Sequence, residues 1–232
     1  MDNYITIKLS MTNCYLIKTV AGYLLIDCGN ERDKNKLIKK LKQLHISLKD
    51  INYLLLTHHH NDHCGLLNFI ISENPSVQVI MSDACANFLK IGKHYKSDNE
   101  HYSNKKLKII TNLYNKLLKT DDNFKIYEYR PQDIIITKDI DELFDTFGLK
   151  GKIIITSGHT EDSISFIIGK TAFVGDAMRN FLNFTGSPYL PILLYSEENC
   201  LESIKKLKNE DIIKICPAHG NSFKTEKCKL LL

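Results

Sequence analysis

Apolar residues in this 232-residue chain alternate between short continuous runs and stretches in which Leu and Ile recur every three or four positions. Short β-branched runs predict strands, and the wider spacing among Lys residues predicts amphipathic helices. Strands are expected near residues 4–9, 14–19, 23–27, 51–57, 77–81, 125–129, 133–137, 152–157, 163–168, 171–175 and 211–216. Helices are expected near residues 32–44, 65–73, 82–91 and 197–208. The pattern by itself indicates a mixed α and β protein.

Residues 92–124 interrupt this order of strands and helices. The segment is rich in Lys, Asn and Tyr, and its apolar residues stand at helical spacing. They are Leu107, Ile110, Leu113, Tyr114, Leu117 and Leu118. We predict an inserted helical hairpin or lid here.

The densest group of chemically active side chains follows the predicted strand 51–57, where the chain reads Thr-His-His-His-Asn-Asp-His-Cys-Gly from Thr57 to Gly65. Imidazole and carboxylate are the usual ligands of zinc and related divalent ions. Several protonated imidazoles so close together would repel one another unless a cation organised them. A solvated His-rich loop would not need the buried strand that precedes this one, so a metal site is the better interpretation.

Three further predicted strands end in the same way. Gly158-His159 follows strand 152–157, Gly175-Asp176 follows strand 171–175, and His219-Gly220 follows strand 211–216. Glycine allows the backbone to turn tightly where ligands must converge. The sequence therefore predicts a site on the rim of a sheet.

These motifs resemble the metallo-β-lactamase-fold hydrolase superfamily, in particular its stand-alone lactonases and its glyoxalase II-like enzymes. The resemblance rests on the pattern His58-x-His60-x-Asp62-His63, which is followed in order by His159, Asp176 and His219. Residues 23–29 are similar to the family's early strand and turn, and residues 157–160 to its third-ligand loop. The resemblance implies an α/β fold that is a four-layer αβ/βα sandwich, with residues 1–232 forming a single metallo-hydrolase domain.

The resemblance also implies a dinuclear metal centre. One ion would be bound by His58, His60 and His159, the second by Asp62, His63 and His219, and Asp176 would bridge both. Zinc is the expected metal, with iron or manganese as alternatives because a mixed oxygen and nitrogen donor set accepts all three. A hydroxide shared by the ions would attack an ester, lactone or thioester carbonyl. Asp62 would orient it and pass a proton to the leaving group.

Departures from related enzymes narrow this function. The lactam-cleaving relatives typically lack the Asp62-His63 plus Asp176 combination and use Cys in place of Asp176, so true β-lactamase activity is not expected. Glyoxalase II carries a C-terminal helical domain that binds glutathione, whereas only residues 221–232 follow His219 here. Two alternatives stay open because one ligand set serves several chemistries: a phosphodiesterase or nuclease-like hydrolase, and a non-catalytic metal-binding sensor.

Residues beside the motifs receive more local interpretations. His59 lies between two expected ligands and is expected to face outward, and Cys64 to serve in packing. Glu161-Asp162 is either a pair of negative charges near the pocket or a solvent-facing turn. In the lactonases that this chain resembles, a Tyr of the corresponding region hydrogen-bonds a substrate oxygen, so the resemblance implies this role for Tyr189 or Tyr195 in the aromatic loop 180–195, with ordinary packing as the alternative. These residues are named here as expectations: His59, Cys64, Glu161, Asp162, Tyr189 and Tyr195.

Composition adds limits on partners and location. The net charge of +4 is spread over many Lys residues on helix-like segments, so a small-molecule substrate is expected rather than a nucleic acid. No apolar run approaches the ~20 residues of a membrane span. The chain shows no secretory signal, and its seven cysteines lack CxxC pairing. We therefore expect a cytoplasmic protein with free thiols, and we leave its oligomeric state open.

Overall fold

The computed structural model describes residues 4–95, 97–118, 123–141, 148 and 151–231. Its larger sheet has six strands in the order β1-β2-β3-β4-β5-β7. Strands β1 to β3 pair antiparallel, and β3, β4, β5 and β7 pair parallel. The strands are β1 Tyr4–Lys8, β2 Asn13–Lys18, β3 Tyr23–Ile26, β4 Ile51–Leu55, β5 Gln78–Ser82 and β7 Ile134–Ile136.

A second sheet of five strands has the order β13-β12-β10-β9-β8. Its strands are β8 Lys152–Ile155, β9 Ile164–Ile168, β10 Thr171–Gly175, β12 Lys214–Pro217 and β13 Phe223–Lys224. A small two-stranded sheet pairs β6 His101–Tyr102 with β11 Leu193–Leu194. This small sheet joins the segment that precedes helix α5 (Lys105–Leu118) to the loop that follows β10.

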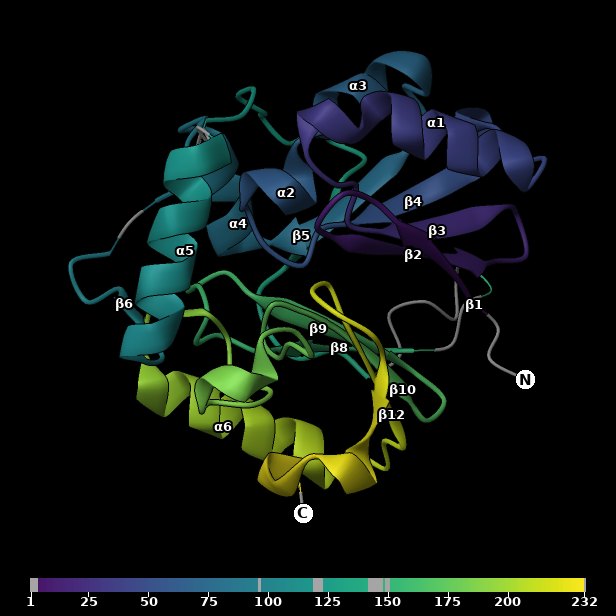
Figure 1. Cartoon of the computed structure of the whole chain (residues 1–232). Coiled ribbons are helices and arrows are strands. Elements are labelled where there is room, and N and C mark those ends of the chain that lie inside the picture. Colours follow the sequence, from purple (N-terminus) through teal and green to yellow (C-terminus); the bar gives the residue numbers. More distant parts are fainter. Residues whose placement is uncertain (1–3, 96, 119–122, 142–147, 149–150, 232) are drawn as a thin grey trace.

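The helices cover the outer faces of the two main sheets (Figure 1). Helices α1 Lys34–Gln43, α3 Leu67–Glu73 and α4 Asp83–Leu89 contribute to one apolar cluster with the first sheet. Helix α6 Glu197–Asn209 packs on the second sheet. The single-turn α2 Asn61–Cys64 follows β4, and α5 Lys105–Leu118 runs along the side of the molecule. Short 3₁₀ turns are η1 Glu31–Asp33, η2 Leu48–Asp50, η4 Asn183–Thr185, η5 Thr225–Lys227 and η6 Lys229–Leu231.

Three hydrophobic clusters separate four layers. Strand β3 shows how the sequence builds them, because Leu25 enters the cluster beneath the helices while Leu24 enters the cluster between the two sheets. The same alternation places Ile154 of β8 against α6 and Ile153 against the other sheet. Period-two alternation with both faces buried gives continuous apolar runs rather than alternating polar ones. The four-layer αβ/βα sandwich expected from the sequence is confirmed.

Most predicted elements are found with ends shifted by a few residues, but the predicted strand 125–129 is wrong. Its apolar residues are spaced as in a strand, but its backbone hydrogen bonds are made to residues outside the sheets. The Tyr127 N–H donates to the Leu89 carbonyl at 3.0 Å, and the Asn68 amide donates to the Lys125 carbonyl at 3.1 Å. The short strands β6, β11 and β13 were not predicted, since two residues carry no periodicity.

The predicted insert 92–124 contains β6 and α5 in its described part, while residues 96 and 119–122 lie outside the described residues. Its role as a lid stays a prediction. Helix α5 buries Leu107 completely and exposes Ile109, Leu113 and Leu117.

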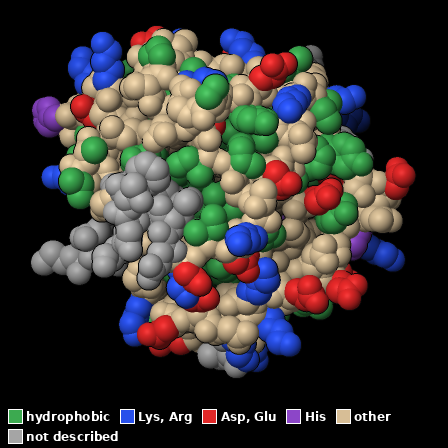
Figure 2. Space-filling view, turned by 180° about the vertical axis from the view of Figure 1, so that it is seen from behind, with side chains coloured by type: hydrophobic (Ala, Val, Ile, Leu, Met, Phe, Trp, Pro, Cys, Tyr) green, Lys and Arg blue, Asp and Glu red, His purple; other side chains and the backbone are tan. Residues whose placement is uncertain are grey.

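Lys and Arg side chains alternate with Asp and Glu on the face shown in Figure 2, with hydrophobic side chains between them. The described residues on that face form no continuous basic stripe. Among the helices that the structure describes, none combines the length and apolar character needed to cross a bilayer.

Candidate metal centre

The end of β4 delivers four of the predicted ligands through one tight turn. The chain leaves the strand at Leu56, and His60 caps the single turn of α2 in an extended conformation with φ −63° and ψ 146°. Asp62 and His63 then lie within that turn. His58 and His63 are fully buried, whereas the Asp62 side chain is 29% exposed. The turn is therefore open to solvent at Asp62 and closed at His58 and His63.

Two glycines allow other strand ends to approach this turn. Gly175 has φ 51°, and a Cβ there would lie 2.4 Å from the Thr57 hydroxyl oxygen. Gly158 has φ 144°, and a Cβ there would lie 2.4 Å from the Cys200 Cα of α6. Asp176 follows the first glycine and His159 follows the second. Larger residues would push both side chains away from the turn.

All the predicted ligands converge. One group is His58, His60 and His159; a second is His58, His63 and Asp176; a third is Asp62, His63 and His219; and within each group the donor atoms lie within 4.8 Å of one another. The Nε2 atom of His219 lies 3.2 Å from Asp62 Oδ2 and 3.3 Å from Asp176 Oδ2. His159 Nε2 lies 3.5 Å from the same Asp176 oxygen. The Asp176 carboxylate thus lies within 3.5 Å of a histidine from each of the three groups, namely His63, His159 and His219.

Buried polar atoms at the centre of this arrangement have no hydrogen-bond partner among the described residues. They are the Nε2 atoms of His58, His60 and His63 and Oδ1 of Asp176. Buried nitrogen and oxygen atoms are nearly always paired, so a converging set of unpaired ones requires an explanation. A divalent cation supplies it, because neutral imidazole and carboxylate are its natural donors. The residues present fit a metal centre.

The opposite ring nitrogens are held by the protein, which fixes the orientation of the imidazoles. His159 Nδ1 lies 2.8 Å from the Leu193 carbonyl of β11, and His219 Nδ1 lies 3.0 Å from the Met11 carbonyl. A carbonyl only accepts, so each Nδ1 carries a proton, and Nε2 is the ring atom that faces the other candidate ligands. This is the arrangement in which outer partners orient metal-binding histidines.

Burial lowers the pKa values of His58 and His60 well below their ordinary value, and neighbouring imidazoles lower them further. Burial also lowers the pKa of His159, partly opposed by Asp176. These three rings are therefore neutral at pH 7, the form that binds a metal.

The carboxylate side of the site shows the opposite balance. Burial raises the pKa of Asp62, but His63 and His219 overcome it and hold that pKa well below its ordinary value. The pKa of Asp176 falls to about 2, because His219 and His63 outweigh its burial. Burial lowers the pKa of His63, but the carboxylates of Asp62, Asp27 and Asp176 outweigh it and raise that pKa to about 9. Both Asp62 and Asp176 are ionised and available to a cation.

Three supporting residues were not found from the sequence. Asp27, at φ 56° after β3, accepts from His63 Nδ1 at 2.8 Å and from the Thr57 N–H at 2.8 Å. The Thr57 hydroxyl also bonds Asp27 at 2.9 Å and contacts His58 Nδ1 at 3.1 Å. The Thr12 hydroxyl donates to Asp62 Oδ2 at 3.0 Å. An Asp in a turn at the end of a buried strand was the available signal for Asp27.

The expectation that His59 faces outward is wrong. Its side chain is 1% exposed and its Nδ1 lies 2.9 Å from the Asp162 carboxylate, which also accepts the His59 N–H at 2.8 Å. Asp162 is equally buried, so it is neither a solvent-facing turn residue nor a charge lining the pocket. Only Glu161 is exposed. His59 and Asp162 are 103 positions apart in sequence, so no local pattern signals their pairing.

The remaining predicted residues lie in different surroundings. Cys64 is buried and its thiol donates to the His59 carbonyl at 3.1 Å, which agrees with a packing role. The Tyr189 ring lies 4.5 Å from the Phe223 ring, in the cluster beneath α6. The Tyr195 N–H donates to the Gly158 carbonyl at 2.8 Å, so its backbone is held at the His159 turn.

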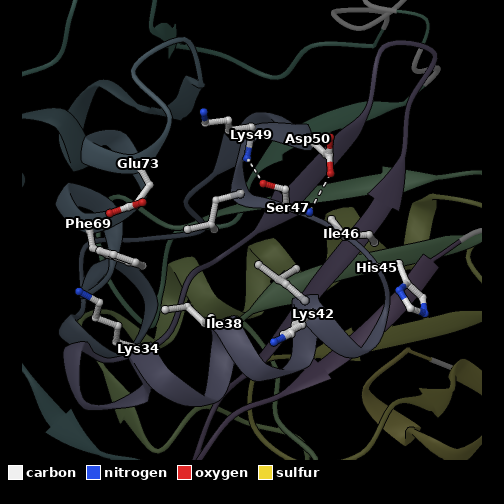
Figure 3. Close-up of a pocket in the computed structure, with 12 residues that line it drawn as sticks. Lys34, Ile38, Lys42, His45, Ile46, Ser47, Lys49, Asp50, Phe69 and Glu73 are labelled. Carbon is white, nitrogen blue, oxygen red and sulfur yellow. Dashed lines mark hydrogen bonds between the residues drawn. The ribbon is translucent and has the colours of Figure 1, made fainter.

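A groove with a volume of about 730 Å³ lies elsewhere, between α1, η2 and α3 (Figure 3). Lys34, Ile38 and Phe69 line it, and its rim contains the capping box formed by Ser47 and Asp50. None of the candidate metal ligands lines this groove. It is therefore separate from the metal centre.

Comparison with known proteins agrees with this geometry. The model of the metallo-β-lactamase superfamily matches residues 7–219. The metallo-β-lactamase fold-containing protein ST1585 of Sulfurisphaera tokodaii is 27% identical over 159 residues, which are 68% of this chain and 56% of that protein. The lactamase-like protein vrtG of Penicillium aethiopicum is 37% identical over 73 residues, 31% of this chain and 23% of that protein. The chain thus matches about half of the first relative's length and less of the second.

Solved structures show the same fold. A mutant metallo-β-lactamase from Cronobacter sakazakii aligns with a TM-score of 0.67 at 16% identity, over 94% of this chain and 77% of that one. BJP-1, a subclass B3 metallo-β-lactamase of Bradyrhizobium japonicum, aligns with a TM-score of 0.65 at 17% identity, over 94% and 75%. At such identities the likeness concerns the fold alone. Because the family model spans residues 7–219, the chain belongs to the metallo-β-lactamase superfamily, whose members are generally metal-dependent hydrolases.

Proposed function

We propose that this protein is a dinuclear metal-dependent hydrolase that cleaves an ester, lactone or thioester. The observation that carries the proposal is the set of converging, buried donor atoms without hydrogen-bond partners among the described residues. One zinc ion would be held by His58, His60 and His159, the other by Asp62, His63 and His219, with Asp176 on both. Bound ions at such a site supply Lewis acidity, which lowers the pKa of water and polarises the oxygen under attack.

Asp62 is the group of the chain best placed to move protons. It is ionised, since its pKa lies well below the ordinary value, and its side chain is partly open to solvent. Thr12 holds one carboxylate oxygen at 3.0 Å, which fixes the direction of the carboxylate. We propose that Asp62 accepts a proton from the attacking water and passes it to the leaving group.

Substrate recognition belongs to the loop between β10 and α6 and to the 92–124 insert. Tyr195 is the better candidate for a substrate hydrogen bond because its backbone is tied to the His159 turn. Tyr189 is half-buried, and its ring packs on Phe223. Tyr195→Phe should therefore change kcat/KM unequally among acyl substrates, and Tyr189→Phe, which keeps the ring, is the matched control.

A cytoplasmic location is part of the proposal. All seven cysteines are free and buried, which is typical of a protein in a reducing compartment. The interspersed charges of Figure 2 support a small-molecule substrate over a nucleic acid.

A substrate panel on zinc-replete protein tests the proposed function. It contains a phenyl ester, a lactone, an acyl thioester, a β-lactam and bis-nitrophenyl phosphate. We expect hydrolysis of at least one acyl substrate, loss of it after chelation, and recovery on adding zinc. Asp62→Asn should abolish most of it, while Asp211→Asn at an exposed carboxylate should not. Cleavage of the phosphodiester alone would establish the nuclease-like alternative, and two bound ions without any turnover would establish a sensor.

A further inference from the structure

The backbone N–H and both ring nitrogens of His59 are hydrogen-bonded, which a role in packing alone does not require. On one side, Asp162 accepts from both the His59 backbone N–H and its Nδ1, at 2.8 and 2.9 Å. On the other side, the backbone N–H of Tyr95 donates to His59 Nε2 at 3.1 Å. Tyr95 belongs to the 92–124 insert. His59 therefore joins the turn that carries the expected ligands to a segment outside the four-layer core.

The direction of these bonds assigns the tautomer of His59. A backbone N–H can only donate, so Nε2 accepts and the proton lies on Nδ1, which donates to Asp162. Both ring nitrogens are thus in use. His59, His60 and His94 have donor atoms within 4.8 Å of one another, but a cation there would have to displace the Tyr95 N–H. The structure consequently favours a positioning role for His59 over a third metal site.

The contact at Tyr95 holds the beginning of the insert beside the ligand group of His58, His60 and His159. The Tyr95 ring stacks on Phe88 of α4, with centroids 4.9 Å apart and an interplanar angle of 12°. The preceding residue, His94, lies with its ring centroid 3.6 Å from that of His60. His94 Nε2 is 3.6 Å from a Glu100 carboxylate oxygen, and the His94 side chain is 10% exposed. The His94 ring therefore lies against the first ligand group.

A second connection reaches the third histidine of the same group. Strand β6 of the insert pairs with β11, with Tyr102 opposite Leu193. The Leu193 carbonyl is the group that orients His159 through Nδ1. The insert thus contacts the site at two points, through His59 beside His60 and through β11 beside His159.

We propose that His59 is a positioning residue that couples the insert to the ligand turn, so that the insert, through the His94 ring, limits the size of the acyl substrate. The selectivity part of this inference rests on the proposed hydrolase function. The coupling part does not, because it concerns contacts within the protein.

Two substitutions separate the two sides of His59. In His59→Asn the side-chain amide N–H can replace Nδ1–H toward Asp162, but nothing reaches Tyr95. In His59→Gln the amide oxygen can reach the Tyr95 N–H, but the Asp162 bond from the ring is lost. His94→Ala is a third variant that keeps the anchor and removes the His94 ring.

Hydrogen exchange of the Tyr95 amide in zinc-replete protein is the first measurement. A neutral hydrogen bond contributes about 0.5–1.5 kcal/mol net, so exchange should accelerate by up to about tenfold in His59→Asn. It should stay near the wild-type rate in His59→Gln and in His94→Ala. Equal exchange in His59→Asn and wild type would overturn the coupling, whatever the protein hydrolyses. If His59→Gln does not fold, the comparison of His59→Asn with wild type still decides.

The ratio of kcat/KM for a long acyl ester to that for a short one is the second measurement. His59→Asn and His94→Ala should raise this ratio by about tenfold without loss of zinc, whereas His59→Gln should leave it near wild type. An unchanged ratio in both His59→Asn and His94→Ala would overturn the selectivity role. If the wild type cleaves no acyl substrate, the proposed function fails, while the exchange result still decides the coupling.

Discussion

Asp27→Asn removes the charge that orients both His63 and Thr57 while keeping the shape of the side chain. Asp27 is 1% exposed, and its carboxylate accepts from His63 Nδ1 at 2.8 Å, from the Thr57 N–H at 2.8 Å and from the Thr57 hydroxyl at 2.9 Å. Hydrogen bonds to a charged group contribute about 1.5–3 kcal/mol each, and an amide cannot accept all three. Loss of such an outer partner typically lowers metal affinity by about 10- to 100-fold.

Competition with a chromophoric zinc chelator measures this affinity for wild type and variant. Asp133→Asn is the matched control, since Asp133 is also a buried, hydrogen-bonded carboxylate but bonds Arg130 and the Val79 N–H away from the site. Both variants should unfold at lower temperature, because each loses buried bonds. Only Asp27→Asn should bind zinc more weakly. Wild-type affinity in Asp27→Asn, or an equal loss in both variants, would refute the reasoning.

Three further predictions concern catalysis, backbone and pH. Asp62→Asn should lower kcat by at least about 100-fold in steady-state assays while part of the zinc stays bound, and near-wild-type turnover would contradict its proton-transfer role. Gly158→Ala should lower the free energy of unfolding by more than about 1 kcal/mol, because its new Cβ would meet the backbone of α6, whereas Gly169→Ala at φ 55° has nothing within 4 Å and should cost less in urea unfolding. Burial raises the pKa of Asp133, but hydrogen bonds from Arg130 outweigh it and hold that pKa below its ordinary value. The ionised carboxylate therefore stabilises the fold fully above the unfolded-state pKa of about 4, and this stabilisation is lost as pH falls through the lower folded-state pKa. The difference in unfolding free energy between wild type and Asp133→Asn should accordingly shrink in strong acid, and a constant difference between pH 7 and pH 2 would show that the ionised carboxylate is not the source.

Most strands of the two main sheets, and the position of the candidate ligands at strand ends, were predictable because they depend on neighbours in sequence, whereas the division of the ligands into two groups came from the resemblance. Strand β4 is apolar on both faces, and the motif that begins at His58 follows directly from its end. His159, Asp176 and His219 each follow a strand of the second sheet, so the strand ends bring them to the same rim. The arrangement in four layers came from the resemblance, since periodicity alone does not order strands.

What escaped prediction depends on contacts between distant segments. His59 looked like an outward-facing residue because its partner, Asp162, is 103 positions away. Segment 125–129 has a strand-like pattern, but Tyr127 bonds Leu89 at the end of α4 instead of a neighbouring strand. The pairing of β6 with β11 involves two residues on each side, too few for any periodic signal.

The central claim is that the converging side chains hold two metal ions. Crystals of zinc-replete protein, measured at the zinc absorption edge, test it most directly through anomalous difference density. We predict two peaks per chain, one among His58, His60 and His159 and one among Asp62, His63 and His219, with Asp176 between them. A single peak, or none at these residues in protein that has not been exposed to chelator, would contradict the account.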